Sequence, residues 1–211
     1  MCRGRHVLKG CRMHLSEGVL SPPILAAGAA LAAACTAAGL RRLDGERLMS
    51  AAMLSAAFFV GSLIHVPIGP GNVHLILNGL LGMILGWAAF PCMLTALMLQ
   101  AVLFQYGGIT VLGVNTVTMA FPAVMAWYLF RPLLGKGPAA RALGAFLGGA
   151  LAVAGAGLIT ALCLAGTDEG FLRSAQLLLL AHIPVMIVEG LISMLTVSFL
   201  ARVRPELLAP R

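Results

Sequence analysis

Uninterrupted apolar stretches of 17 residues or more recur along this sequence, and they limit its fold more than any other feature. Each is long enough to cross a hydrocarbon core of about 30 Å at about 1.5 Å per helical residue. Strands of a transmembrane barrel would alternate apolar and polar residues, whereas these stretches are continuous. Only 10% of the 211 residues are charged, against about a quarter in soluble domains. We therefore predict an all-α integral membrane protein, built as a bundle of six to seven transmembrane helices.

The boundaries between apolar stretches set the number of crossings. The predicted segments are 20–40, 48–65, 73–90, 91–106, 112–130, 142–166 and 174–201. The segment 91–106 is short, and only Pro91 separates it from the segment before it. It is either a full crossing, a tilted or half-buried helix, or one part of a broken helix. The pattern of apolar segments is therefore compatible with either six or seven crossings.

Basic residues gather in the links 41–47 and 131–141 and in the C-terminal tail. With seven crossings these three stretches lie on one side of the membrane, which the positive-inside rule identifies as the cytoplasm. The links on the opposite side hold one basic residue, Arg173. This bias favours seven crossings and predicts an N-terminus outside a bacterial or archaeal cell membrane. Because the charges act as topology signals, no nucleic-acid partner is expected.

The first twelve residues conflict with this topology, because they contain four basic residues that would lie outside. They also lack the apolar core of a signal peptide. Residues 13–19 contain no Lys or Arg, so a chain that begins at Met13 removes the conflict. We therefore expect residues 1–12 to be a misassigned start or a removed extension. Residues 13–211 are then a single transmembrane domain.

A stripe of small residues runs along the first apolar segment. It consists of Ala26, Ala30, Ala34 and Ala38, at four-residue spacing. Small residues at this spacing allow another helix to approach closely. The stripe is either a packing face inside the bundle or a docking face for a partner membrane subunit. The second reading suits a small bundle that has no energy-coupling domain of its own.

Histidines surround a turn-rich link, HVPIGPGNVH, between the second and third segments. Irregular backbone at membrane depth is tolerated where it is buried in protein or lines a cavity, so we predict a pocket-forming loop. The topology puts His14, His65 and His74 near the outer face, and neutral imidazole binds cobalt, nickel, copper and zinc. Each ring could instead be satisfied by a backbone carbonyl, so spacing alone does not decide for a metal site.

A chain that begins Met13-His14 offers a chelate at its own terminus. The free amine, the amide nitrogen of His14 and its imidazole can close two fused rings on one metal ion. Three coplanar nitrogens favour a metal with a square-planar preference, such as Ni(II) or Cu(II), and His74 could fill the fourth position. The amide must lose its proton, so metal binding should weaken as pH falls.

Four motifs resemble those of the CbiM/NikM family: MHLSEGVL, HVPIGPGNVHLILNGLLG, QYGGITVLGVNTVTMAFPA and AHIPVMIVEGLIS. Together they cover nearly all of residues 13–200. Members of this family are the substrate-capture (S) components of energy-coupling factor (ECF) transporters for cobalt and nickel. The resemblance implies that the amine of Met13, the amide and ring of His14, and His74 hold the metal. The family loop often has Ser or Thr before its last histidine, whereas GPGNVH here changes the surroundings of Asn72.

The same resemblance implies partners and a substrate. The partners are a transmembrane coupling (T) subunit, two ATPase subunits and, in the cobalt branch, a small accessory membrane subunit. Co(II) or Ni(II) is the transported substrate, in a process connected with cobalamin biosynthesis. The loop is closer to the cobalt branch, whereas a square-planar nitrogen site accepts nickel readily. A nickel-specific importer subunit is therefore the alternative.

Polar side chains in or beside the apolar segments are costly in lipid and usually face the bundle interior. We expect them to support the metal site or to form interhelical hydrogen bonds. The candidates are His65, Asn72, Asn78, Gln105 and Asn115. Asn78 is predicted to lie one helical turn after His74, on the same face. His182 and Glu189 share a face of the last segment, and a structural role is expected for them rather than a proton relay.

Other classes of function lack their motifs in this sequence. There is no GxxxxGK[ST] phosphate loop and no HExxH zinc-protease motif. An intramembrane serine hydrolase is a rival, but no serine lies in a GxSxG turn. A stand-alone metal channel or secondary transporter is a second rival, and internal repeats, which would favour a secondary transporter, are not evident. We therefore expect a binding and transport subunit rather than an enzyme.

Overall fold

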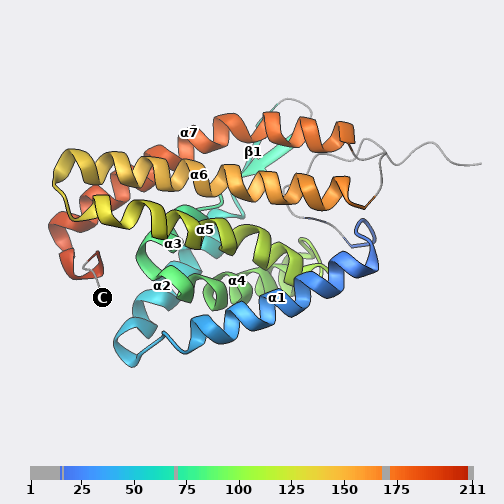
Figure 1. Ribbon diagram of the computed structural model, residues 1–211, viewed down its shortest axis with the longest axis horizontal. Helices are drawn as coiled ribbons and strands as arrows, with labels where there is room; N and C mark the ends of the chain where they lie inside the picture. Colours follow the sequence, from blue (N-terminus) through green and yellow to red (C-terminus); the bar gives the residue numbers. More distant parts are fainter. Residues whose placement is uncertain (1–14, 16, 69–70, 168–171, 209–211) are drawn as a thin grey trace, which may run out of the picture.

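The computed structural model describes residues 15, 17–68, 71–167 and 172–208 (Figure 1). Its helices are α1 (Pro22–Leu40), α2 (Gly45–Gly61), α3 (Asn78–Leu85), α4 (Ala89–Phe104), α5 (Leu112–Leu134), α6 (Pro138–Ala165) and α7 (Leu172–Val203). The short 3-10 helices η1 (Gly86–Ala88) and η3 (Pro205–Leu207) follow α3 and α7. Strands β1 (His65–Ile68) and β2 (Gly71–His74) form an antiparallel pair between α2 and α3.

Five helical stretches of the described chain are long and apolar enough to cross a membrane. They are Pro22–Leu40, Asn78–Phe104 (α3, η1 and α4 counted together), Leu112–Leu134, Pro138–Ala165 and Leu178–Val203. Helix α2 has 17 residues and therefore a length of about 25 Å. Large apolar side chains such as Leu162 and Leu195 are 62% and 65% exposed, as expected for a surface that faces lipid. The prediction of an all-α integral membrane protein is confirmed.

Helix α3 is a half-length helix that runs alongside α5 and ends at Gly86. Asn78, its first residue, donates a hydrogen bond to the carbonyl of Met119, and Gly86 lies against Trp127 further along α5. Gly86 has a φ of 57°, in the left-handed region that glycine enters without steric cost. The chain reverses there, and α4 runs back through the bundle beside α2 (Figure 1).

The predicted boundary at Pro91 is therefore wrong. Segments 73–90 and 91–106 were expected to separate at this proline, but the break falls five residues earlier, at Gly86. Pro91 lies in the first turn of α4, where backbone N–H groups have no partner within the helix. The N–H group that proline lacks is therefore not needed there, and Pro91 does not break the helix. The short helix is α3, not the segment 91–106.

Close contacts of backbone with backbone hold α3 in the centre of the bundle. A Cβ on Gly82 would collide with the carbonyl of Ala123 on α5, and a Cβ on Gly79 would collide with Gly148 and Gly149 on α6. Small residues at these crossings let helices approach closely, which is a main source of stability for helices in lipid. Helix α3 thereby becomes a buried element with neighbours on both sides.

The link predicted as an irregular loop contains a short hairpin. Its register pairs His65 with His74, Val66 with Val73, Pro67 with Asn72 and Ile68 with Gly71. Pro67 is compatible with a two-stranded ribbon, because a strand at a sheet edge does not need every N–H. The hairpin lies beside α7 (Figure 1), and residues 69–70 fall outside the described chain.

The alanine stripe of α1 faces outward. Ala26, Ala30 and Ala34 are exposed and Ala38 is half-buried, whereas Gly28 and Gly39 are buried. The buried face packs through these glycines, Gly28 against α5 and Gly39 against the backbone before α4. The interpretation of the stripe as an internal packing face is therefore wrong. The docking face for a partner stays a prediction.

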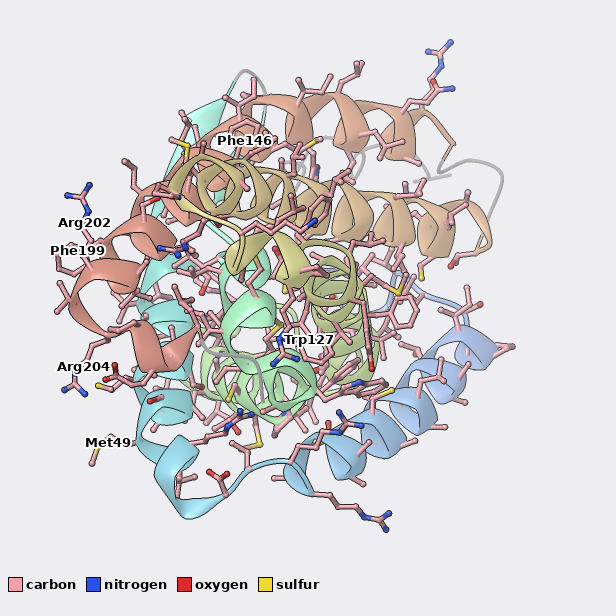
Figure 2. The ribbon with its side chains drawn as sticks, turned by 60° about the vertical axis from the view of Figure 1, so that its left-hand side comes forward. Met49, Trp127, Phe146, Phe199, Arg202 and Arg204 are labelled. Carbon is pink, nitrogen blue, oxygen red and sulfur yellow. The ribbon has the colours of Figure 1, made fainter. Side chains whose placement is uncertain are left out.

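The two ends of the bundle differ in chemistry. Arg47 of α2, Arg131 of α5 and Arg204 after α7 line a single cavity at one end, so the three basic stretches do lie on the same side. The described start of the chain lies at the other end, where Leu15 contacts the beginning of α5. Figure 2 shows Trp127, Arg204 and Met49 near the basic end.

Candidate functional site

The backbone of Leu15 is held by the side chain of Asn115 near the start of α5. The amide of Leu15 donates to Oδ1 of Asn115 at 3.2 Å, and the carbonyl of Leu15 accepts from Nδ2 at 3.2 Å. Both residues are buried. An amide side chain that satisfies both backbone groups of one residue fixes its position closely. The chain is therefore anchored at the residue that directly follows His14.

A second contact docks the same segment onto the link before α5. The carboxylate of Glu17 accepts a hydrogen bond from the backbone N–H of Thr110 at 3.2 Å. The side chain of Glu17 lies close against Gly108, whose φ of 133° and missing Cβ make the approach possible. The N-terminal segment is thus held at two points on residues 108–115.

Glu189 of α7 holds the chain that leaves the hairpin. Both of its oxygens accept from the backbone N–H of Leu77, at 2.8 and 2.9 Å, and Oε1 also accepts from Ile76. The side chain is 0% exposed. Hydrogen bonds from backbone N–H to a carboxylate are among the strong ones in proteins. Strand β2 ends at His74, the predicted metal ligand. The backbone groups that Glu189 binds therefore begin two residues after it, at Ile76.

Asn78 continues the anchoring at the start of α3. Its Nδ2 donates to the carbonyls of Met119 at 3.1 Å and Ala152 at 3.2 Å, and its Oδ1 accepts from the N–H of Gly79. The expectation that Asn78 follows His74 by one helical turn is wrong. The intervening residues are not helical, and Leu77 has a left-handed φ of 54°. Asn78 bridges α3, α5 and α6 instead.

One turn of α5 is the meeting point of these contacts. Asn115 binds the residue after His14, and the carbonyl of Met119 binds Asn78, four residues after His74. Residues four apart on a helix are separated by about 6 Å along its axis. The two stretches that follow the predicted ligands are therefore anchored within one helical turn. Such rigid backbone support is what a preorganised ligand site requires.

The predicted ligands themselves are described only in part. Met13 and His14 lie outside the described residues, and for His74 and His65 the structure describes the backbone, with the two residues directly opposite in the hairpin. Among the described residues, no three His, Cys, Asp or Glu side chains come together as a metal site. The ligand set of Met13, His14 and His74 stays a prediction.

The remaining candidates have distinct surroundings. Gln105 ends α4 with a left-handed φ of 56° and an exposed side chain. The Nδ1 of His182 lies 2.6 Å from the carbonyl of Leu178, so this nitrogen carries the hydrogen, and the ring packs beside Gly157. These contacts fit the structural role expected for His182.

The sequence did not indicate the partners of Glu189. A carboxylate within an apolar segment is unusual enough to signal a special role. The backbone N–H donors that its carboxylate binds could not be identified, because Ile76 and Leu77 lie more than a hundred positions away in the chain. The role expected for Glu189 was structural, and the structure locates that role at the exit of the histidine hairpin.

The fold and the site define a multi-pass membrane protein in which the segment at Leu15 and Glu17 and the chain after the hairpin are anchored by polar side chains. Residues 14–207 match the family described as "Cobalt uptake substrate-specific transmembrane region", CbiM. The chain belongs to this family. Its membership confirms the resemblance seen in the four motifs, and it makes the chain a membrane protein of cobalt and nickel transport.

Two curated relatives and one solved structure agree with this assignment. A protein of Haemophilus influenzae, named for metal transport, is 50% identical over 93% of this chain and 97% of its own length. The fused nickel transport protein NikMN of Rhodobacter capsulatus is 31% identical, over 94% of this chain and 65% of that protein. The crystal structure of a truncated transition metal transporter is 30% identical, with a TM-score of 0.78, and the match covers 90% of this chain and 98% of that one.

Proposed function

We propose that this chain is the substrate-binding membrane subunit of an ECF-type importer and captures Co(II) or Ni(II) at the outer face. The ligands are the amine of Met13, the amide and imidazole nitrogens of His14, and the imidazole of His74. The observation that carries the proposal is the single turn of α5 that anchors both the chain after His14 and the chain after His74. Two anchored segments can present their ligands to one ion without a large ordering cost.

The chemistry of these donors suits the proposed substrate. Amine, amide and imidazole nitrogens form a planar set, and a second imidazole completes a square of nitrogen donors. The backbone of His65 is paired with that of His74 in the hairpin register, so we propose that His65 belongs to the surroundings of the fourth ligand. Glu189 and Asn115 form hydrogen bonds with backbone groups close in sequence to the proposed ligands. Residues around a metal site commonly orient its ligands in this way.

The chelate requires a free amine on Met13, so we propose that the working protein begins there. The family match begins at residue 14, which supports the proposal. The four basic residues within residues 1–12 would otherwise lie on the outer side. A peptide bond before Met13 would remove the amine and with it one ring of the chelate.

The sequence has no GxxxxGK[ST] nucleotide loop, so the chain cannot hydrolyse ATP by that route. We propose a transmembrane coupling subunit and ATPase subunits, with a small accessory membrane subunit in a cobalt system. The outward alanine stripe of α1 supports a docking face for a membrane partner. A nickel-specific importer is the alternative, because relatives are named for both metals.

Metal retention by histidine variants tests the proposal. We expect His74→Ala and His14→Ala, each purified with the native N-terminus, to lose tightly held Co(II) or Ni(II). His182→Gln is the matched control, because this histidine bonds its own helix, and it should keep the metal. Retention by either site variant as tight as in the parent contradicts the ligand assignment. Metal uptake without ATPase partners would instead support a channel or a secondary transporter.

A further inference from the structure

A buried amide on α4 has an acceptor atom without a partner. Gln100 is 1% exposed, and its Oε1 accepts no hydrogen bond in the part of the chain that the structure describes. Two other buried side-chain oxygens of the described residues share this condition, those of Thr36 and Ser193. Both are hydroxyls, which can rotate to donate to a neighbouring carbonyl. The amide oxygen of Gln100 can only accept, so it needs a donor from elsewhere.

The surroundings on α2 determine which way this amide points. The hydroxyl of Ser62 donates to the carbonyl of Phe59 at 2.9 Å, so the hydroxyl oxygen is left as an acceptor. The Nε2 of Gln100 donates to that oxygen and, at 3.4 Å, to the carbonyl of Phe59. A flipped amide would place its oxygen against two acceptors. The orientation is therefore fixed, and Oε1 is the atom that α2 does not use.

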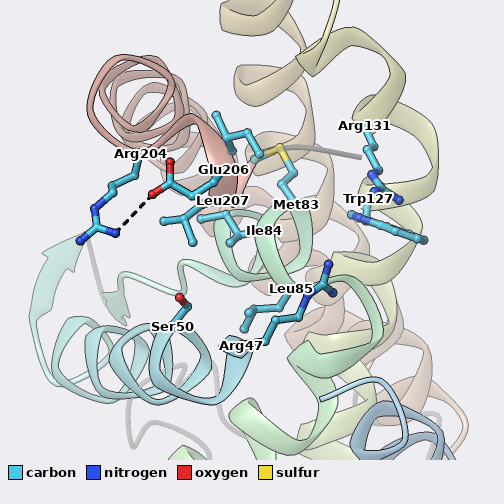
Figure 3. A pocket seen from close by; sticks show the side chains of 11 residues that line it. Arg47, Ser50, Met83, Ile84, Leu85, Trp127, Arg131, Arg204, Glu206 and Leu207 are labelled. Atoms are coloured by element: carbon cyan, nitrogen blue, oxygen red, sulfur yellow. Dashed lines mark hydrogen bonds and ion pairs between the residues drawn. The ribbon is translucent and has the colours of Figure 1, made fainter. Parts of the chain in front are cut away.

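Other polar side chains of the described chain have their partners. At the basic end, Nη1 of Arg204 lies 3.2 Å from Oε1 of Glu206 (Figure 3). Inside the bundle, both oxygens of Glu189 accept from backbone N–H groups, and the amide of Asn78 is bonded through its nitrogen and its oxygen. Buried polar groups in native proteins are nearly always hydrogen-bonded. The unpartnered oxygen of Gln100 is therefore a candidate for a functional contact.

The amide of Gln100 lies where the first strand of the hairpin leaves the bundle. Ser62, which it binds, caps the C-terminus of α2. Strand β1 begins three residues later at His65, which pairs with His74. Three residues span at most about 11 Å. Both hairpin histidines therefore have their backbone near this amide.

The second strand returns to the same end of α2. A Cβ on Gly61, the last residue of α2, would meet the side chains of Leu75 and Leu77. Leu75 directly follows His74, the predicted metal ligand. The turn that holds the amide of Gln100 thus has the hairpin on both sides.

We propose that Oε1 of Gln100 accepts a hydrogen bond from the imidazole N–H of His74 and orients this ring toward the metal ion. A histidine ligand binds the metal through one ring nitrogen and almost always donates from the other, commonly to a carboxylate or a carbonyl oxygen. This inference rests on the proposed function, in which His74 supplies the fourth nitrogen. Gln100 is a positioning residue, because it acts on the metal through His74.

Ni(II) binding by variants with the native N-terminus tests the proposal. Competition with a chelator measures the affinity, and the visible absorption of the bound ion reports its nitrogen donors. We expect Gln100→Leu to weaken binding about 10- to 100-fold and to shift the absorption band. Ser62→Ala is the matched control, because it removes one contact of Nε2 and leaves Oε1 and the bond to Phe59 in place. Its affinity and absorption band should equal those of the parent.

A second variant separates the acceptor from the donor of the amide. Gln100→Glu keeps Oε1 and loses the nitrogen that binds α2, so it should bind Ni(II) more tightly than Gln100→Leu. A purely structural bond between α2 and α4 predicts the opposite, since Ser62→Ala and Gln100→Glu would then weaken binding as much as Gln100→Leu. That result would overturn the proposal.

His65 is the other hairpin histidine that could donate to Oε1. The effect of Gln100→Leu should persist in a His65→Ala background, because the proposed donor is His74. If the effect disappears in that background, Oε1 binds His65 and the proposal is wrong.

Failure of the proposed function gives a different result. A parent chain without tightly bound metal, or a His74→Ala variant that binds Ni(II) as the parent does, would contradict the ligand assignment and this inference with it. A parent that binds Ni(II), a His74→Ala variant that does not, and a Gln100→Leu variant equal to the parent would overturn the role of Gln100 alone.

Discussion

Asn115 and Glu189 each bind backbone rather than another side chain. Asn115 satisfies both polar groups of Leu15, and Glu189 accepts from the N–H groups of Ile76 and Leu77. Backbone groups inside a membrane protein need partners from the protein, because lipid offers none. These two side chains therefore allow non-helical segments to exist inside the bundle, next to His14 and His74.

Replacing Glu189 with Gln tests its part in metal capture. The change keeps the size of the side chain but replaces one of its two acceptor oxygens with an NH2 donor, which cannot accept from the backbone N–H groups of Ile76 and Leu77. We expect the affinity for Co(II) or Ni(II) to fall about 10- to 100-fold, as for other residues that orient ligands. Competition with a chelator of known affinity measures the change.

Ser193→Ala is the matched control for this variant. Ser193 is buried one turn further along α7 and has no hydrogen-bond partner among the described residues. Its variant should bind metal as the parent does. An unchanged affinity in Glu189→Gln, at a Tm equal to that of the parent, would show that the clamp does not position the hairpin for metal binding.

At the scale of elements, α3 depends on backbone contacts that a methyl group would break. In Gly82→Ala the new Cβ meets the carbonyl of Ala123, which α3 or α5 must move to accommodate. Overpacking of this kind typically destabilises a protein by about 1–3 kcal/mol. Thermal unfolding in detergent should show a lower Tm for this variant. Gly135→Ala is the control, since a Cβ there meets nothing within 4 Å and should leave the Tm unchanged.

The alanine stripe of α1 gives a prediction about assembly. Ala30→Leu/Ala34→Leu adds bulk to an outward face and leaves the buried glycines of α1 in place. We expect this variant to fold and to keep its metal but to lose its coupling subunit in co-purification. A double substitution of Leu151 and Leu158 to Ala, at exposed positions of α6 away from the stripe, should leave assembly intact. Normal co-purification of the stripe variant would remove the stripe from the interface.

The long helices were predictable from the sequence, because continuous apolar runs admit one structure in lipid. The reversal at Gly86 was not predictable, because Pro91 is the stronger helix breaker in the sequence. Gly86 ends the helix through its positive φ, which only the folded surroundings impose. The orientation of α1 was also hidden, since small residues occur on both of its faces. For the site, Asn78 and Asn115 were identifiable as costly polar groups, but their backbone partners on distant segments were not.

At the scale of the whole molecule, the two ends of the bundle differ in the residues that they bring together. One end anchors the N-terminal segment and the exit of the histidine hairpin on α5 and α7. The other end gathers three arginines and the short tail around one cavity. We propose from the charge bias that the first end faces outward and the second faces the cytoplasm.

The central claim is that a chain beginning at Met13 holds one transition metal ion at the outer end. The most direct test is elemental analysis of protein purified from its native membrane, together with N-terminal sequencing of the same sample. The account predicts one Co(II) or Ni(II) ion per chain and a sequence that begins Met13-His14. A chain that binds its metal with residues 1–12 still attached, or that begins at Met13 and holds no metal, would contradict it.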